Sequence, residues 1–155
     1  MRYSGVRIPG PMRAEHRKSL VEHSKMAVAA DRATLGRMRI LLVEDSWQLG
    51  IALKGLLQSL GLTVAGPVAT SVDAERLASA QLPDLALVDI NLRGGEQAYG
   101  LIDRLLDLGV RVIVTSGYAE LPMLPARVSA VLQKPIKEAQ LLAILEDPSG
   151  PTTVA

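Results

Sequence analysis

The chain has 155 residues, of which 48% are hydrophobic, and this is a usual size for one globular domain with a complete core. It contains no cysteine, which excludes disulfide scaffolds, thiolate metal sites and cysteine nucleophiles and is compatible with the cytoplasm, where we expect the protein to act. No apolar stretch is long enough to span a bilayer, so no membrane association is expected.

The charge is distributed unevenly along the chain. Residues 1–37 hold eight Lys and Arg against three Asp and Glu, a balance of +5, whereas residues 38–155 hold nine against thirteen, a balance of −4. The basic segment lacks the apolar core and small-residue cleavage site of a secretory signal. Basic arms can bind nucleic acid or anionic lipid, but most are solvated tails. We therefore predict a flexible extension without direct nucleic acid binding, although an alternative start at Met38 could also explain it.

The first strand and helix have clear boundaries. Residues 39–43 form an apolar run that predicts a buried parallel strand, and the run ends at Glu44 and Asp45. Ser46 can cap the following helix, and Gly61 can end it. The apolar positions of this helix recur at helical spacing: Leu49, Leu53, Leu56, Leu57 and Leu60.

A second strand and helix follow. Residues 62–68 read as a strand at an edge of the sheet, because Pro67 cannot donate a hydrogen bond to a neighbouring strand. Thr70 and Asp73 have capping-box spacing, which predicts a short helix to about Ala80.

The alternation continues in the second half of the chain. Residues 84–88 predict a third strand that runs into Asp89, and a helix between a Gly94-Gly95 loop and Gly109 carries one apolar face. The members of that face are Ala98, Leu101, Ile102 and Leu105. Alternating strands and helices predict a doubly wound α/β fold, with a parallel sheet covered on both faces and right-handed crossovers.

Two further strands complete the predicted five. Residues 110–114 form a fourth strand that ends at Thr115 and Ser116, and residues 130–133 form a fifth that ends at Lys134. The last helix carries Leu141, Leu142 and Leu145, and a short tail occupies residues 148–155. The segment between the fourth and fifth strands contains Pro122 and Pro125, so its helix is expected to be short or mobile.

Polar side chains follow four of the predicted strands. In an open parallel sheet, ligands bind outside the carboxyl ends of the strands, where Glu44, Asp45, Asp89, Thr115 and Lys134 should meet. Three adjacent carboxylates repel one another, and a set of oxygen ligands without His or Cys favours Mg2+. Asp89 could then supply a nucleophilic oxygen, while Lys134 and Thr115 bind phosphoryl oxygens.

Residues 38–147 resemble the receiver domain of two-component response regulators. The matching segments are Leu-Leu-Val-Glu-Asp-Ser at 41–46, Pro-Asp-Leu-Ala-Leu-Val-Asp-Ile-Asn-Leu at 83–92, Val-Thr-Ser-Gly at 114–117 and Lys-Pro at 134–135. The resemblance implies a five-stranded, flavodoxin-like sheet in the order 2-1-3-4-5. It further implies that Mg2+ is held by Asp45, by Asp89 and by the backbone carbonyl of Asn91, with Glu44 orienting a metal-bound water.

The resemblance also implies the reaction. Asp89 would take the phosphoryl group from a histidine kinase or a histidine phosphotransfer protein, Thr115 and Lys134 would bind the phosphoryl oxygens, and the Lys134–Pro135 peptide would be cis. A stand-alone receiver would then signal to a downstream protein through protein–protein contacts, without being an enzyme.

Two positions depart from the common receiver pattern. Val131 stands where receivers commonly place an aromatic switch residue, and Ile136 replaces the aromatic that often follows Lys-Pro. The segment 115–118 is similar to the motif of a receiver subgroup, sometimes written FATGUY, that lacks the fifth-strand aromatic. In that subgroup Tyr118 would be the candidate switch residue.

Plainer interpretations stand beside these roles. Asp89 and Asn91 favour Asx turns, Thr115 can satisfy a backbone group at a strand end, and Lys134 and Tyr118 can be ordinary surface residues. Two other functions remain open. A haloacid-dehalogenase-like phosphatase or phosphotransferase also uses an aspartate and Mg2+, but it needs a second acid where Asn91 stands. A pseudo-receiver would bind partners without phosphorylation.

Overall fold

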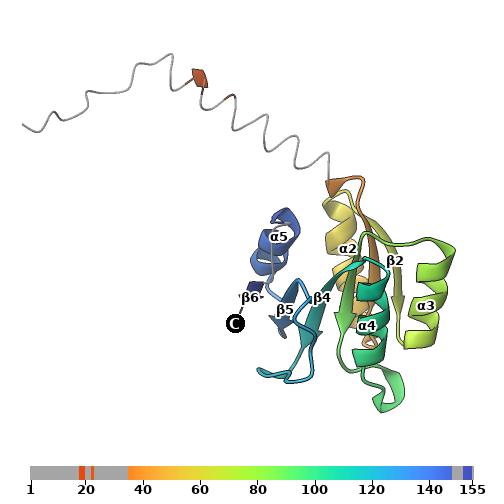
Figure 1. Ribbon diagram of the computed structural model, residues 1–155. Helices are drawn as coiled ribbons and strands as arrows, with labels where there is room; N and C mark the ends of the chain where they lie inside the picture. Colours follow the sequence, from red (N-terminus) through yellow and green to blue (C-terminus); the bar gives the residue numbers. More distant parts are fainter. Residues whose placement is uncertain (1–17, 20–21, 23–34, 148–151, 155) are drawn as a thin grey trace, which may run out of the picture. The chain divides into compact units, whose positions relative to one another are not determined.

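The fold is known from a computed structural model that describes residues 18–19, 22, 35–147 and 152–154. Within residues 35–147 and 152–154 the chain forms one parallel sheet in the order β2-β1-β3-β4-β5-β6 (Figure 1). The strands are β1 (Arg39–Val43), β2 (Thr63–Val68), β3 (Leu85–Asp89), β4 (Arg111–Ser116), β5 (Ala130–Gln133) and β6 (Thr152–Val154). The predicted order of the first five strands is confirmed. The short strand β6, in the segment expected to be a tail, was not predicted.

Four helices cover the two faces of the sheet. They are α2 (Trp47–Ser59), α3 (Ser71–Ala80), α4 (Tyr99–Asp107) and α5 (Glu138–Glu146), with one 3-10 turn, η1 (Arg93–Gly95). The apolar residues of α3 and α4 pack against one face, and those of α2 and α5 pack against the other. The three central strands, β1, β3 and β4, are therefore buried on both faces, which explains their continuous apolar runs.

The helix ends follow the sequence signals. The Ser46 hydroxyl accepts a 3.4 Å hydrogen bond from the N–H of Leu49, and the Thr70 hydroxyl accepts one of 3.2 Å from the N–H of Asp73. Gly61 and Gly109 follow α2 and α4 with φ angles of +87° and +79°, which glycine adopts without a steric penalty.

Strand β2 lies at the edge of the sheet, as expected, and it carries a bulge. Leu41 pairs with Ala65 but Val43 pairs with Val68, so β2 contains one residue more than β1 in this interval. The Gly66–Pro67 peptide is cis, and so is the Lys134–Pro135 peptide that the receiver resemblance implied.

Consecutive turns replace the short helix expected between β4 and β5. Two N–H groups close these turns, with Leu124 donating to the carbonyl of Leu121 and Val128 donating to that of Pro125, both at 3.2 Å. The two prolines, Pro122 and Pro125, have no N–H group for a helical ladder, which accounts for the difference. Leu121, Leu124 and Val128 still pack against the core on the α3–α4 face.

Most of the predicted N-terminal extension, residues 1–37, lies outside the described residues. Leu35 is buried in the core on the α2–α5 face, and its carbonyl accepts a 2.9 Å hydrogen bond from the N–H of Met38. Among the residues that the structure describes, no helix has the length and apolar character needed to cross a bilayer.

Candidate functional site at the carboxyl ends of the strands

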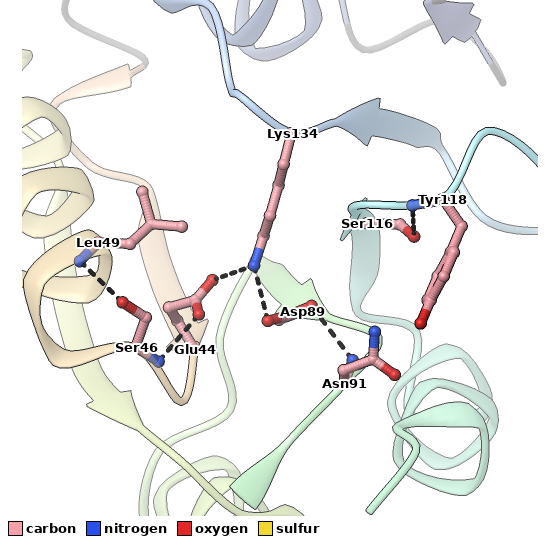
Figure 2. A network of polar contacts seen from close by, with 8 residues as sticks. All are labelled: Glu44, Ser46, Leu49, Asp89, Asn91, Ser116, Tyr118 and Lys134. Atoms are coloured by element: carbon pink, nitrogen blue, oxygen red, sulfur yellow. Dashed lines mark hydrogen bonds and ion pairs between the residues drawn. The ribbon is translucent and has the colours of Figure 1, made fainter. Parts of the chain in front are cut away.

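Three side chains meet at the carboxyl ends of β1, β3 and β5 (Figure 2). The Nζ atom of Lys134 lies 2.8 Å from Oδ2 of Asp89 and 3.1 Å from Oε2 of Glu44. The structure thus brings together residues 45 and 90 positions apart in the sequence, as the strand-end argument predicted. One ammonium group bridges two carboxylates that would otherwise repel each other.

Asp89 is the last residue of β3 and is almost fully buried. Its Oδ1 accepts a 3.1 Å hydrogen bond from the N–H of Asn91, so the predicted Asx turn is present. Its Oδ2 accepts the bond from Lys134 at the same time. The turn and the charged contact therefore coexist, and the turn fixes the orientation of the carboxylate.

Glu44 is held from two directions. Its side chain is only 1% exposed, and its Oε1 accepts a 3.0 Å hydrogen bond from the N–H of Ser46. Its Oε2 forms the ion pair with Lys134 but makes no hydrogen bond of good geometry within the described residues. Burial, with a further contribution from the nearby charge of Asp89, raises the pKa of Glu44 to about 7. This carboxyl group therefore titrates near neutral pH unless a cation binds beside it.

The Lys134 side chain is 26% exposed, and its surroundings act on the ammonium group in opposite directions. Burial alone would lower the pKa of Lys134, but the hydrogen bonds and charges of Asp89 and Glu44 outweigh burial and raise it. The side chain consequently stays protonated across the physiological range.

Asp45 completes an acidic cluster at the surface. It is exposed, and one carboxylate oxygen from each of Glu44, Asp45 and Asp89 lies within 4.8 Å of the others. Oxygen donors without His or Cys suit a hard divalent ion. The buried Oε2 of Glu44, which lacks a well-directed partner, retains capacity for a metal-bound water. The residues present therefore fit Mg2+.

Thr115 and Tyr118 occupy different environments. Thr115 is buried on β4 directly opposite Asp89, and its carbonyl accepts a 3.0 Å hydrogen bond from the N–H of Ile90. Tyr118 is 62% exposed, and its N–H donates a 2.9 Å hydrogen bond to the buried hydroxyl of Ser116 (Figure 2). Thr115 thus lies beside Asp89 on the neighbouring strand, whereas the Tyr118 side chain is at the surface.

Two serines of the site were not recognised from the sequence. Ser46 was expected only as a helix cap, yet its N–H also donates a hydrogen bond that orients Glu44. The hydroxyl of Ser116 accepts a hydrogen bond from the N–H of Tyr118, where the chain leaves β4. Serine directly after a strand-end acid, or at a strand end before glycine, is the only signal that could have indicated these contacts.

The chain is similar in sequence to proteins of a known family. A family model described as the response regulator receiver domain matches residues 40–146. The chain is 31% identical to the phyllosphere-induced regulator PhyR of Methylorubrum extorquens over 134 residues, which cover 76% of this chain and 49% of that protein. The chain thus spans about half the length of this relative.

Solved structures show the same fold. A CheY-like response regulator receiver domain from Methylobacillus flagellatus matches with a TM-score of 0.63 and 26% identity, covering 70% of this chain and 96% of that one. SdrG from Sphingomonas melonis Fr1 matches with a TM-score of 0.59 and 29% identity, covering 71% and 97%. The chain therefore belongs to the response regulator receiver domain family of two-component signalling.

Proposed function

We propose that Asp89 accepts a phosphoryl group from the phosphohistidine of a histidine kinase or of a histidine phosphotransfer protein. The observation that carries this proposal is the buried Asp89 carboxylate, which contacts the Lys134 ammonium at 2.8 Å and shares an acidic cluster with Glu44 and Asp45. We further propose that residues 38–147 form the receiver domain, between an N-terminal extension and a short C-terminal tail.

Four groups would hold Mg2+ in this proposal. Asp45 and Asp89 would bind the ion through their carboxylates, Asn91 through its backbone carbonyl, and Glu44 through a metal-bound water. When bound, the ion supplies positive charge that reduces repulsion between the carboxylates and the incoming phosphoryl oxygens.

The protein residues position and stabilise the transfer. An oxygen of Asp89 forms a bond to phosphorus while the bond from phosphorus to the donor imidazole nitrogen breaks, and the electron pair returns to the imidazole. The product is an acyl phosphate on Asp89. Lys134 lies within hydrogen-bond distance of the nucleophile, and its ammonium can follow the new phosphoryl oxygens. The Thr115 hydroxyl, on the adjacent strand, would donate to one of these oxygens.

Output would pass to a downstream protein through surface contacts. Val131 on β5 leaves no aromatic switch at that position, which agrees with membership of the FATGUY-type subgroup. The N–H of Tyr118 is tied to Ser116, next to Thr115, so movement of Thr115 toward a phosphoryl group would be transmitted along the backbone to Tyr118. Tyr118 is therefore our candidate for the switch residue.

The test uses a small phosphodonor and mass spectrometry. Incubation of the full chain with Mg2+ and acetyl phosphate or phosphoramidate should add one phosphoryl group that is stable in acid and labile in base. Asp89→Asn should abolish this gain, whereas Asp103→Asn, an equal change at an exposed position on α4, should leave it intact. An Asp89→Asn variant that is still phosphorylated would contradict the proposal, and sustained hydrolysis of phosphate esters would favour a phosphatase.

A further inference from the structure

An unusually close contact between α2 and β2 lies beside Glu44. A Cβ atom placed on Gly50 of α2 would lie 2.8 Å from Cβ and 2.9 Å from Cγ of Pro67 on β2. The same atom would lie 3.7 Å from Cγ of Glu44. Carbon atoms in contact are normally about 3.5–4.0 Å apart, so only glycine permits this approach of the helix to the strand.

The bulge of β2 places Pro67 at this contact. Gly66 precedes it with a φ of +103°, a left-handed conformation that glycine favours, and a Cβ atom at Gly66 would collide with the carbonyl oxygen of Leu42. The carbonyl of Gly66 accepts a 3.1 Å hydrogen bond from Nζ of Lys54, also on α2. The bulge is therefore fixed against both β1 and α2.

Both partners in the contact are connected to Glu44. On the helix side, the N–H of Gly50 donates a 2.8 Å hydrogen bond to the carbonyl of Ser46, and the N–H of Ser46 donates to Oε1 of Glu44. On the strand side, the carbonyl of Val68 accepts a 2.9 Å hydrogen bond from the N–H of Glu44. A displacement of either α2 or the bulge therefore reaches Glu44.

We infer that Gly50 and Pro67 are positioning residues whose close contact sets the place of Glu44 in the Mg2+ site, an inference that rests on the proposed function. An alanine at position 50 fits only if the first turn of α2 or the backbone at Pro67 moves, because the proline ring is tied to the main chain and cannot turn aside. Each of these movements shifts a hydrogen bond to Glu44.

The test compares equal substitutions on one helix. Gly50→Ala introduces the overlap, whereas Gly55→Ala adds the same methyl group to α2 at an exposed position, where it meets no atom within 4 Å beyond its chain neighbours and the backbone of the helix itself. Mg2+ alone is titrated into each full-length protein and followed by calorimetry and by the fluorescence of Trp47, the single tryptophan. We expect Gly50→Ala to weaken Mg2+ binding about tenfold or more, as changes beside metal ligands commonly do, and Gly55→Ala to match the wild type.

A double variant separates positioning from general loss of fold. The pair Glu44→Gln and Glu44→Gln with Gly50→Ala is compared with wild type and Gly50→Ala. If Gly50 acts through the position of Glu44, Gly50→Ala should weaken Mg2+ binding much less in the Glu44→Gln background than in the wild type, even if the variants fold less well. An equal fold-loss in the two backgrounds, or a Gly50→Ala protein that binds Mg2+ like Gly55→Ala, would overturn the inference while leaving the proposed function intact. A wild-type protein that neither binds Mg2+ nor becomes phosphorylated would overturn both.

Discussion

Lys134 donates a 2.8 Å hydrogen bond from its ammonium group to Oδ2 of Asp89, and the same ammonium pairs with Glu44. Both carboxylates are buried, so in the metal-free protein the Lys134 ammonium is the positive charge that offsets them.

Replacement of Lys134 by methionine should destabilise the metal-free protein. The change leaves the carboxylates of Asp89 and Glu44 buried without their cation, and we expect a free energy of unfolding at pH 8 lower by about 2 kcal/mol. Urea denaturation with and without Mg2+ measures this, and Mg2+ should stabilise the variant more than the wild type. Lys137→Met, at an exposed position, is the control and should change little. Equal stabilities for wild type and Lys134→Met would contradict the role of the ammonium.

Mg2+ binding should depend on pH near neutrality. The pKa of Glu44 is about 7, and the group must be ionised to orient a metal-bound water, so protons compete with the ion. Between pH 8 and pH 6 the dissociation constant for Mg2+ should rise about tenfold. Calorimetric titrations at several pH values test this, with Glu44→Gln expected to bind more weakly and with a flatter pH profile. A wild-type profile as flat as that of Glu44→Gln would rule out this linkage.

The titration of Glu44 should also change the stability of the metal-free protein. This stability should fall as pH rises, whereas Mg2+ binding should strengthen. A carboxyl group with a higher pKa in the folded than in the unfolded state stabilises the fold fully below the unfolded value of 4.5, and this contribution is lost as pH rises through about 7. The wild type should therefore lose stability relative to Glu44→Gln between pH 5 and pH 8. Urea titrations of both proteins across this range measure the difference, and a gain for the wild type would contradict the assignment.

Much of this site could be predicted because its residues follow strands whose apolar runs are unmistakable. Glu44 directly follows β1 and Asp89 is the last residue of β3, and the carboxyl ends of parallel strands lie at the same edge of the sheet. The β2 bulge was not predictable, because Pro67 indicates an edge strand but does not reveal an inserted residue. The pairing of β6 with β5 also depends on contacts between distant segments, which local sequence patterns do not report.

The turn segment between β4 and β5 shows the same limit. Pro122 and Pro125 correctly indicated an interrupted helix. The conformation of the segment also depends on which of its side chains pack against the core, and this cannot be read from local sequence. Leu121 and Leu124 pack against the sheet from turns, so burial is achieved without helical hydrogen bonds.

Arg111 should stabilise the end of α5. Its guanidinium donates hydrogen bonds of 2.7 and 2.8 Å to the carbonyls of Ile144 and Asp147, at the end of α5, where a helix has no following turn to donate to its last carbonyls. Arg111→Met should lower the free energy of unfolding by about 1–2 kcal/mol and speed hydrogen exchange in the last turn of α5. Arg76→Met removes an exposed ion pair instead and should cost less than about 0.5 kcal/mol. Equal effects of the two changes would show that the Arg111 contacts do not cap α5.

If Asp89 becomes an acyl phosphate, reductive mapping identifies it as the phosphorylated residue. Borohydride reduces an aspartyl phosphate to homoserine, so the phosphorylated full-length protein is treated, digested and sequenced by mass spectrometry. We expect homoserine at position 89 alone, dependent on Mg2+ and on the phosphodonor. Homoserine at Asp45 or elsewhere, or none in a protein that has gained a phosphoryl group, would contradict it.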